Sequence, residues 1–373
     1  MDNKKKRFKK PDTVLTIAWI LAMVSAFFVH PGKDYLGYID FRSLGILWGL
    51  MVIIQGFKEN AVFEKTAGFL LSKVRSSRQL AAVLVFMCFI GSMLITNDVA
   101  LITFVPFALM ILHDCGREDM MIPTVVLQTV AANLGSMLTP IGNPQNLYLY
   151  GLTGMGLGEF ILILLPYSLV SAILLALAIF FLTPGRQKNL STGKDSAVTS
   201  NFGSKRQIII YALLFATALL SVVRVLPWYV FAIIVLIIVG GMDYKIILRA
   251  DYILLLTFIG FFIFTGNMGN ISAISSFLQD ILSDREFPIA IALSQVISNV
   301  PATLMLSGFT TNYKDLLLGV NIGGLGTLIA SMASLISYKA YTKEFKENSM
   351  KYLLFFTAVN VAFLAVLVLV ARI

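Results

Sequence analysis

The chain has 373 residues, of which 58% are hydrophobic and 13% are charged, and its formal net charge is +9. Soluble domains carry about 25% charged residues, so this composition excludes a disordered chain, a collagen-like chain and an ordinary cytosolic enzyme. It predicts an all-α protein that crosses a membrane several times. The cysteines, Cys88 and Cys115, are too few for a disulfide framework.

The N-terminus combines a basic segment, residues 1–12, with the apolar run 13–30. Secretory signal peptides have this shape, and Val24-Ser25-Ala26 resembles a cleavage site. Because further apolar runs follow instead of a soluble domain, we favour an uncleaved signal anchor with residues 1–12 in the cytoplasm.

Apolar runs near the length of a membrane-spanning helix continue along the chain. We expect nine of them to cross the membrane: 13–30, 43–57, 120–150, 157–183, 207–224, 227–240, 251–267, 315–338 and 350–372. With the N-terminus inside, most of the 29 basic residues then lie in cytoplasmic segments, as the positive-inside rule requires. The positive charge therefore indicates topology and not a nucleic-acid partner, and the C-terminus is predicted outside.

Two further runs, 79–111 and 287–309, each carry an asparagine near the middle, Asn97 and Asn299. Each arm around Asn299 has about ten residues, or about 15 Å of helix, which is half a hydrocarbon core. This predicts a re-entrant helical hairpin. The longer arms around Asn97 could cross twice, but an internal repeat predicts a hairpin there too.

The repeat is a pair of motifs that occur in the same order in both halves of the chain. The pattern N-[LI]-G-x3-T-x-I-x-[NS]-x2-[NS] occurs at 133–146 and 321–334, and S-x2-I-[ST]-N precedes it at 92–97 and 294–299. Further upstream, Gly56 and Asn60 correspond to Gly266 and Asn270. We therefore expect each half to contain a spanning helix, an amphipathic stretch (59–73 and 271–284), a hairpin, a broken helix and a final spanning helix.

The halves are 13–183 and 207–373, joined by a cytoplasmic linker at 184–206 that is rich in Ser, Thr, Lys and Gly. Nine crossings leave the two halves in opposite orientation. Inverted repeats with broken helices are typical of secondary transporters.

The broken segments combine helix breakers with polar side chains. Gly135, Pro140 and Gly142 do not suit the middle of a helix, and Thr139 and Asn143 are polar. Freed carbonyls and Thr or Asn oxygens suit a small hard cation, and a half-helix N-terminus suits an anion. The second half repeats the break with Gly323, Gly324, Gly326 and Thr327.

Each hairpin tip has a short polar cluster, Thr96-Asn97-Asp98 and Ser298-Asn299-Val300. These residues either only cap the helices or also bind a ligand. Asp98 is an ionisable group within an apolar run, which is a functional hypothesis by default. Its possible roles are cation ligand, proton carrier and helix cap. The motifs contain no Lys or Arg, so an anion would depend on amides, helix dipoles and co-bound cations, whereas a cation could bind Asp98 directly.

These motifs resemble the ion transporter superfamily, which includes the ArsB arsenite permeases, the NhaD sodium/proton antiporters, the citrate transporters and the divalent anion/sodium symporters. The resemblance covers about residues 40–372 and extends to short bacterial permeases of the YbiR type. It implies two inverted repeats, and a transport part that moves as an elevator against a scaffold, commonly in a homodimer.

The resemblance also implies site residues. One sodium site would use Thr96, Asn97, Gly135 and Thr139, and the other Ser298, Asn299, Gly323 and Thr327. The substrate would contact Asn97, Asp98, Asn299, Val300, Pro140, Asn143 and Thr327. Asp98 and Val300 replace the Thr that touches a substrate carboxylate in the symporters, which argues against dicarboxylate transport. An Asp at this position instead resembles the arsenite-permease and antiporter branches. This resemblance implies proton coupling through the carboxyl group of Asp98.

We therefore expect a secondary active transporter, not an enzyme, in the cytoplasmic (inner) membrane of a bacterium. It would move a small anion, an inorganic oxyanion or a carboxylate, and would use Na⁺ or H⁺ as the coupling ion without a cofactor. The alternative is a cation/proton antiporter using Asp98. A channel and an intramembrane enzyme are further alternatives, although no H-E-x-x-H or G-x-S-x-G motif is present.

Overall fold

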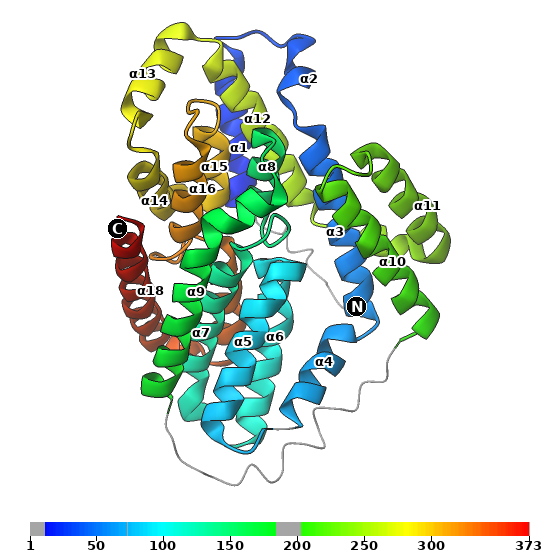
Figure 1. The fold of residues 1–373 in the computed structure, drawn as a ribbon, viewed down its shortest axis with the longest axis vertical. Helices are drawn as coiled ribbons and strands as arrows, with labels where there is room; N and C mark the ends of the chain where they lie inside the picture. Colours follow the sequence, from blue (N-terminus) through cyan, green and yellow to red (C-terminus); the bar gives the residue numbers. More distant parts are fainter. Residues whose placement is uncertain (1–11, 73, 184–202, 373) are drawn as a thin grey trace, which may run out of the picture.

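The computed structural model describes residues 12–72, 74–183 and 203–372, and in these residues every regular element is a helix (Figure 1). Residues 1–11 of the expected N-terminal segment and 184–202 of the expected linker lie outside the described residues. The described helices that are long and apolar enough to cross a membrane are α3 (Phe41–Glu59), α5 (Ser77–Ile95), α6 (Asn97–Asp114), α9 (Leu157–Leu182), α10 (Lys205–Val222), α11 (Trp228–Ile247), α12 (Tyr252–Gly269) and α18 (Ser349–Ala371). The chain is a multi-pass membrane protein.

Both expected hairpins are present as helix pairs, although each arm of the first is long enough to cross a membrane. The first consists of α5 and α6, and the second of α14 (Glu286–Ile297) and α15 (Asn299–Leu306). In each, one residue ends the first arm and begins the second: Thr96, with φ 69° and ψ 151°, and Ser298, with φ 76° and ψ 153°. The two hairpins thus turn through the same unusual backbone conformation, as the repeat predicts.

Both expected broken helices are present as well. The first half contains α7 (Met121–Ser136) and α8 (Pro144–Thr153), and the second half contains α16 (Tyr313–Ile322) and α17 (Met332–Glu344). The helix restarts at α8 because Pro144 suits the first turn and Asn143 caps it, accepting from the Asn146 N–H at 2.9 Å.

Hydrogen bonds between hairpin and break follow the repeat. In each half, the second residue of the tip donates its backbone N–H to a carbonyl of the break, and the Thr of the break donates its hydroxyl to a carbonyl of the hairpin. The four bonds are Asn97 N–H to Gly142 O (3.0 Å), Asn299 N–H to Ala330 O (2.9 Å), Thr139 Oγ1 to Met93 O (2.5 Å) and Thr327 Oγ1 to Gln295 O (3.0 Å). The equivalence found in the sequence therefore holds in three dimensions.

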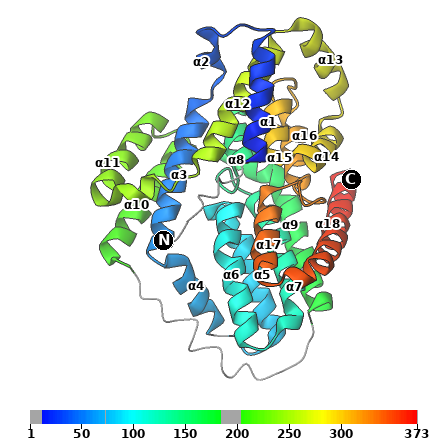
Figure 2. The same ribbon diagram turned by 180° about the vertical axis from the view of Figure 1, so that it is seen from behind.

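A scaffold beside the hairpins and broken helices consists of α1 (Thr13–Ala26), α2 (Asp34–Tyr38), α3 and α10 to α12. Within it, α1 and the short α2 pack on α12, and α10 and α11 pack on α3. Helices α9 and α18 instead pack on α7. Figure 2 shows α3, α10 and α11 at the left of the molecule and α12 with α1 at its upper centre. The Asn60 and Asn270 side chains donate to the Gly56 and Gly266 carbonyls at 2.8 and 2.9 Å, so α3 and α12 end alike.

The two amphipathic stretches form α4 (Val62–Leu71) and α13 (Ser272–Leu282). Helix α4 packs on both arms of the first hairpin, whereas α13 packs on α12. Short 3-10 turns, η1 (Glu118–Met120) and η3 (Lys346–Asn348), precede α7 and α18. Figure 1 shows α5 and α6 in the lower half of the molecule and α14 to α16 in the upper half, which agrees with inverted halves.

Candidate functional site

The two broken helices are joined by side-chain hydrogen bonds around two buried asparagines, Asn133 on α7 and Asn321 on α16. Each accepts through its oxygen from one residue of the opposite break and donates through its amide to another. The bonds are Ser331 Oγ to Asn133 Oδ1 (2.9 Å), Asn133 Nδ2 to Ser334 Oγ (3.5 Å), Asn143 Nδ2 to Asn321 Oδ1 (3.1 Å) and Asn321 Nδ2 to Asn146 Oδ1 (2.7 Å). Asn133 and Asn321 are the first residues of the repeat motif in their own halves. Each therefore binds the two polar residues that end the motif in the other half.

The tip of the first hairpin packs against the first break. Asn97 is buried and donates through Nδ2 to Asn133 Oδ1 at 3.3 Å, while its own Oδ1 is buried without a hydrogen-bond partner. Gly135 lies against the hairpin so closely that a Cβ there would meet the Phe89 carbonyl oxygen at 2.0 Å. Buried acceptors are rarely left unpaired, so Asn97 Oδ1 is suited to receive a cation or a donor group of a substrate.

The second tip is arranged similarly, but more of its buried polar atoms have hydrogen-bond partners. Ser298, Asn299 and Val300 are buried, and Gly323 approaches the hairpin as Gly135 does in the first half. Thr327 lies at the protein surface of the break. The residues expected to form each cation site are therefore brought together in each half, at separate tips.

Both tips use a positive φ at a residue that has a side chain, Thr96 and Ser298. Such conformations cost on the order of 1–3 kcal/mol each and persist at sites that the surrounding structure holds in place. Their occurrence at equivalent positions supports a functional role for the tips beyond helix capping.

A cavity of about 170 Å³ lies where the first tip meets the scaffold helices α3 and α12. Thr96 and Asp98 line it from the hairpin, and Lys58, Arg249 and Asp251 line it from the scaffold. Of the residues expected to contact substrate, Asp98 faces this cavity. Asn97, Asn299, Val300, Pro140, Asn143 and Thr327 are not part of its lining.

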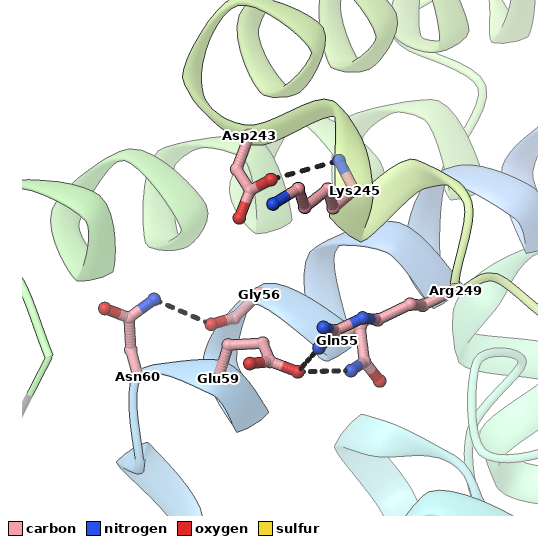
Figure 3. Close-up of polar contacts among 7 residues, drawn as sticks. All are labelled: Gln55, Gly56, Glu59, Asn60, Asp243, Lys245 and Arg249. Carbon is pink, nitrogen blue, oxygen red and sulfur yellow. Dashed lines mark hydrogen bonds and ion pairs between the residues drawn. The ribbon is translucent and has the colours of Figure 1, made fainter. Parts of the chain in front are cut away.

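The scaffold side of the cavity is a polar cluster that joins α3 to the turn between α11 and α12 (Figure 3). Arg249 forms an ion pair with Glu59, and Gln55 donates to the same Glu59 oxygen at 2.9 Å. No sequence motif singles out Lys58 or Arg249 among the basic residues that indicate topology. Helix packing, and not a local pattern, brings both to the cavity that Asp98 lines.

Among the described residues, no three His, Cys, Asp or Glu side chains gather into a metal-binding group. A coupling cation at either tip would therefore be held by carbonyl, hydroxyl and amide oxygens, with Asp98 nearby at the first tip.

The multi-pass helical fold with two paired breaks is typical of a membrane transporter. The citrate transporter family model matches residues 7–313, and the chain belongs to that family. Its relatives include Uncharacterized transporter MJ0456 of Methanocaldococcus jannaschii, 34% identical over 81% of each chain, and Inner membrane protein YbiR of Escherichia coli, 29% identical over 85% of this chain and 84% of that one. The Silicon efflux transporter LSI3 of Oryza sativa is 30% identical over 39% of this chain and 30% of its own.

Proposed function

We propose that this protein is a secondary active transporter that moves a small anion across the cytoplasmic membrane, coupled to Na⁺ or H⁺. The observation that carries this proposal is the cavity between hairpin and scaffold, because it combines Asp98 with the cationic Lys58 and Arg249. The sequence motifs contain no cationic partner for an anion, whereas the scaffold supplies Lys58 and Arg249, of which Arg249 is also paired with Glu59.

The size of the cavity favours a small substrate. Its volume of about 170 Å³ corresponds to about six water molecules at about 30 Å³ each, while pockets for drug-sized ligands begin near 300 Å³. An inorganic oxyanion or a short carboxylate fits this volume. The names of the family and of the rice relative specify citrate and silicon, so the substrate has to be established for this chain itself.

The position of the cavity supports an elevator mechanism. The cavity lies between the part made of hairpins and broken helices and the scaffold of α1, α3 and α10 to α12. Movement of the first part against the second would carry a bound ion from one face of the membrane to the other. We further propose the inner membrane of a bacterium as the location, a cytoplasmic N-terminus, an outside C-terminus and a homodimer.

The alternative is a cation/proton antiporter, and a specific observation favours it. Asp98 and Asp251 line the same cavity from opposite sides, and two carboxylates can compete for a cation or a proton. Asp98→Asn discriminates between the two functions. Loss of cation/proton exchange in this variant is expected of an antiporter that uses Asp98, and exchange that survives would rule out Asp98 as the exchanging group.

The test is uptake into proteoliposomes that contain the purified full chain, under an imposed Na⁺ or pH gradient. The panel should include inorganic oxyanions, short carboxylates and citrate. We expect saturable, gradient-driven uptake of a small oxyanion or short carboxylate. Proton release on addition of Na⁺, without uptake of any anion, would instead support the antiporter.

Arg249→Gln tests the role of the scaffold cations in the same assay. An exposed ion pair contributes about 0.2–1 kcal/mol, so we expect KM for the anion to rise by up to about five-fold. Lys245→Gln is the matched control, because Lys245 lies nearby but does not line the cavity (Figure 3). Equal effects of both changes would place anion recognition elsewhere.

A further inference from the structure

The second half of the molecule contains a side chain in the position where its coupling cation was expected. Gln295 lies one turn before the tip of the second hairpin, and its carboxamide points into the break between α16 and α17. Its Nε2 is 3.0 Å from both Gly323 O and Leu325 O and 3.2 Å from Ile291 O, and its Oε1 accepts from the Thr327 N–H at 2.8 Å. One amide group thus occupies the centre of a set of three carbonyl oxygens.

These contacts conflict with a cation at the same place. Hard cations such as Ca²⁺ hold oxygen ligands at about 2.3–2.6 Å, and they need several at once. Gly323 and Thr327 were expected to supply such ligands. The Gly323 carbonyl and the Thr327 backbone are already bound to Gln295, and the Thr327 hydroxyl donates to the Gln295 carbonyl at 3.0 Å. The residues of this half therefore do not fit a further cation between tip and break.

The backbone is shaped to admit the glutamine. Gly326 has φ +105°, a conformation that residues with side chains rarely adopt, and a Cβ there would meet Gln295 Oε1 at 2.3 Å. At the equivalent positions of the first half stand Met93 and Leu138, so neither the amide nor the glycine is present. The two residues that differ between the halves, Gln295 and Gly326, are thus in direct contact and depend on each other.

The first half differs in a second respect. There, an amide also holds three carbonyls of the break, but it comes from Asn146 of α8: its Nδ2 lies 3.0 Å from Met137 O, 3.2 Å from Thr139 O and 3.4 Å from Ser136 O. None of these is the Gly135 carbonyl, the counterpart of Gly323 O. The hairpin contributes no amide to this contact, and Asn97 Oδ1 at its tip remains buried without a partner. An acceptor that is free to bind a cation is therefore present at the first tip.

We propose that the Gln295 carboxamide permanently takes the place of one of the two expected coupling cations, so that only the first half responds to a cation. This inference rests on the proposed function, because an amide in place of a cation reduces the number of ions that are transported with the substrate. It also keeps the second hairpin fixed to its broken helix throughout the cycle.

The experiment is thermal melting of the purified full chain in NaCl and in choline chloride. Replacing Gln295 by Met, the residue at the equivalent position of the first half, frees the carbonyls of the second break. We expect Gln295→Met to lower Tm in choline chloride and NaCl to restore much of the loss. Gln295→Glu at alkaline pH should show a larger Na⁺ effect, because its carboxylate would face the same carbonyls and require a cation between them.

Gln128→Met is the matched control. Gln128 is buried and also donates to two carbonyls, Leu84 O at 3.2 Å and Phe104 O at 3.3 Å, but away from the breaks. Its loss should lower Tm equally in both salts. If both Gln295 variants behave like Gln128→Met, Gln295 is an ordinary backbone partner and the inference is wrong. Because melting requires no transport, a failure of the proposed function would appear in the uptake assay and not here.

Discussion

At the scale of single residues, the charge of Asp98 decides what the cavity can hold. Asp98 lines the cavity from the hairpin, and Asp251, Lys58 and Arg249 line it from the scaffold. Charges about 4 Å apart near a protein surface interact by about 4 kcal/mol at an effective dielectric constant of 20. Neutralising Asp98 by a proton, or by a cation at the adjacent tip, therefore favours an anion in the cavity. Such a link between two ions is what coupled transport requires.

Asp98→Asn imitates the neutral form permanently. We expect this variant to bind the anion and to exchange labelled for unlabelled anion across a proteoliposome membrane. If the proton is the coupling ion, accumulation driven by a pH gradient should be lost, because the proton carrier is missing. Asp251→Asn serves as the control, since it removes a carboxylate from the scaffold side only. Normal pH-driven accumulation in Asp98→Asn would show that Asp98 does not carry the proton.

Asn143 tests the network that joins the halves. Asn143→Ala removes the cap of α8 and leaves Asn321 Oδ1 without its donor. The loss of a cap costs about 1 kcal/mol and a buried unpaired group about 1–3 kcal/mol, so we expect the free energy of unfolding to fall by about 2–4 kcal/mol.

Asn143→Ser should cost less than about 1 kcal/mol, because serine also caps helices and Ser331 performs the equivalent contact in the other half. Thermal or denaturant unfolding in detergent measures both variants. A loss below about 1 kcal/mol for both variants would mean that the cap and the cross-half bond contribute little, and equal losses of about 2–4 kcal/mol would mean that serine does not replace the asparagine.

At the scale of helices, the close contact between hairpin and broken helix depends on glycine. A Cβ at Gly135 would lie 2.0 Å from Phe89 O and 2.7 Å from Ser92 Oγ. Overpacking of this kind typically costs about 1–3 kcal/mol. We expect Gly135→Ala to lower Tm and to reduce uptake, because the tip is displaced from the break.

Gly158→Ala, on α9, is the control for the Gly135 substitution. Nothing lies within 4 Å of a Cβ at Gly158, so this change should be neutral or slightly stabilising. A Gly135→Ala protein that melts and transports like Gly158→Ala would show that the hairpin and the break tolerate separation.

Most of these elements could be predicted from the sequence because their causes are local. Pro140 and Gly142 lie in the first break, and Asn97 and Asn299 begin the second arms of the hairpins, as expected. A single proline is not sufficient for a break, because Pro106 and Pro166 lie inside α6 and α9. The predicted helix ends are less accurate where polar residues continue a helix. Helix α11 extends to Ile247, beyond the expected end at 240, with non-helical backbone at Asp243.

The cavity could not be predicted in the same way. Glu59 and Arg249, which meet at its scaffold side, are 190 residues apart, and no periodicity relates them. The repeat likewise aligned Met93 with Gln295 but gave no reason for the glutamine to turn into the break. Contacts of this kind depend on how helices pack, and one sequence contains no local signal for that packing.

At the scale of the whole molecule, the two inverted halves predict where each loop lies relative to the membrane. The loop at the base of the first hairpin, which contains Cys115, is expected in the cytoplasm. The turn between α13 and α14, which contains Ser283, is expected outside. Cys88 is buried, so Cys115 is the cysteine that a reagent in water can reach.

We therefore expect a membrane-impermeant maleimide to label Cys115 in inside-out vesicles and not in intact cells. Burial and the neighbouring Asp114 raise the pKa of the Cys115 thiol above its usual value, against an opposing effect of Arg117. Because the thiolate is the reactive form and a raised pKa reduces its fraction near neutrality, labelling should accelerate as the pH increases. In a Cys115→Ser background, Ser283→Cys should show the opposite sidedness. Labelling of both positions from the same side would contradict the inverted arrangement, since the bases of the two hairpins would then face one compartment.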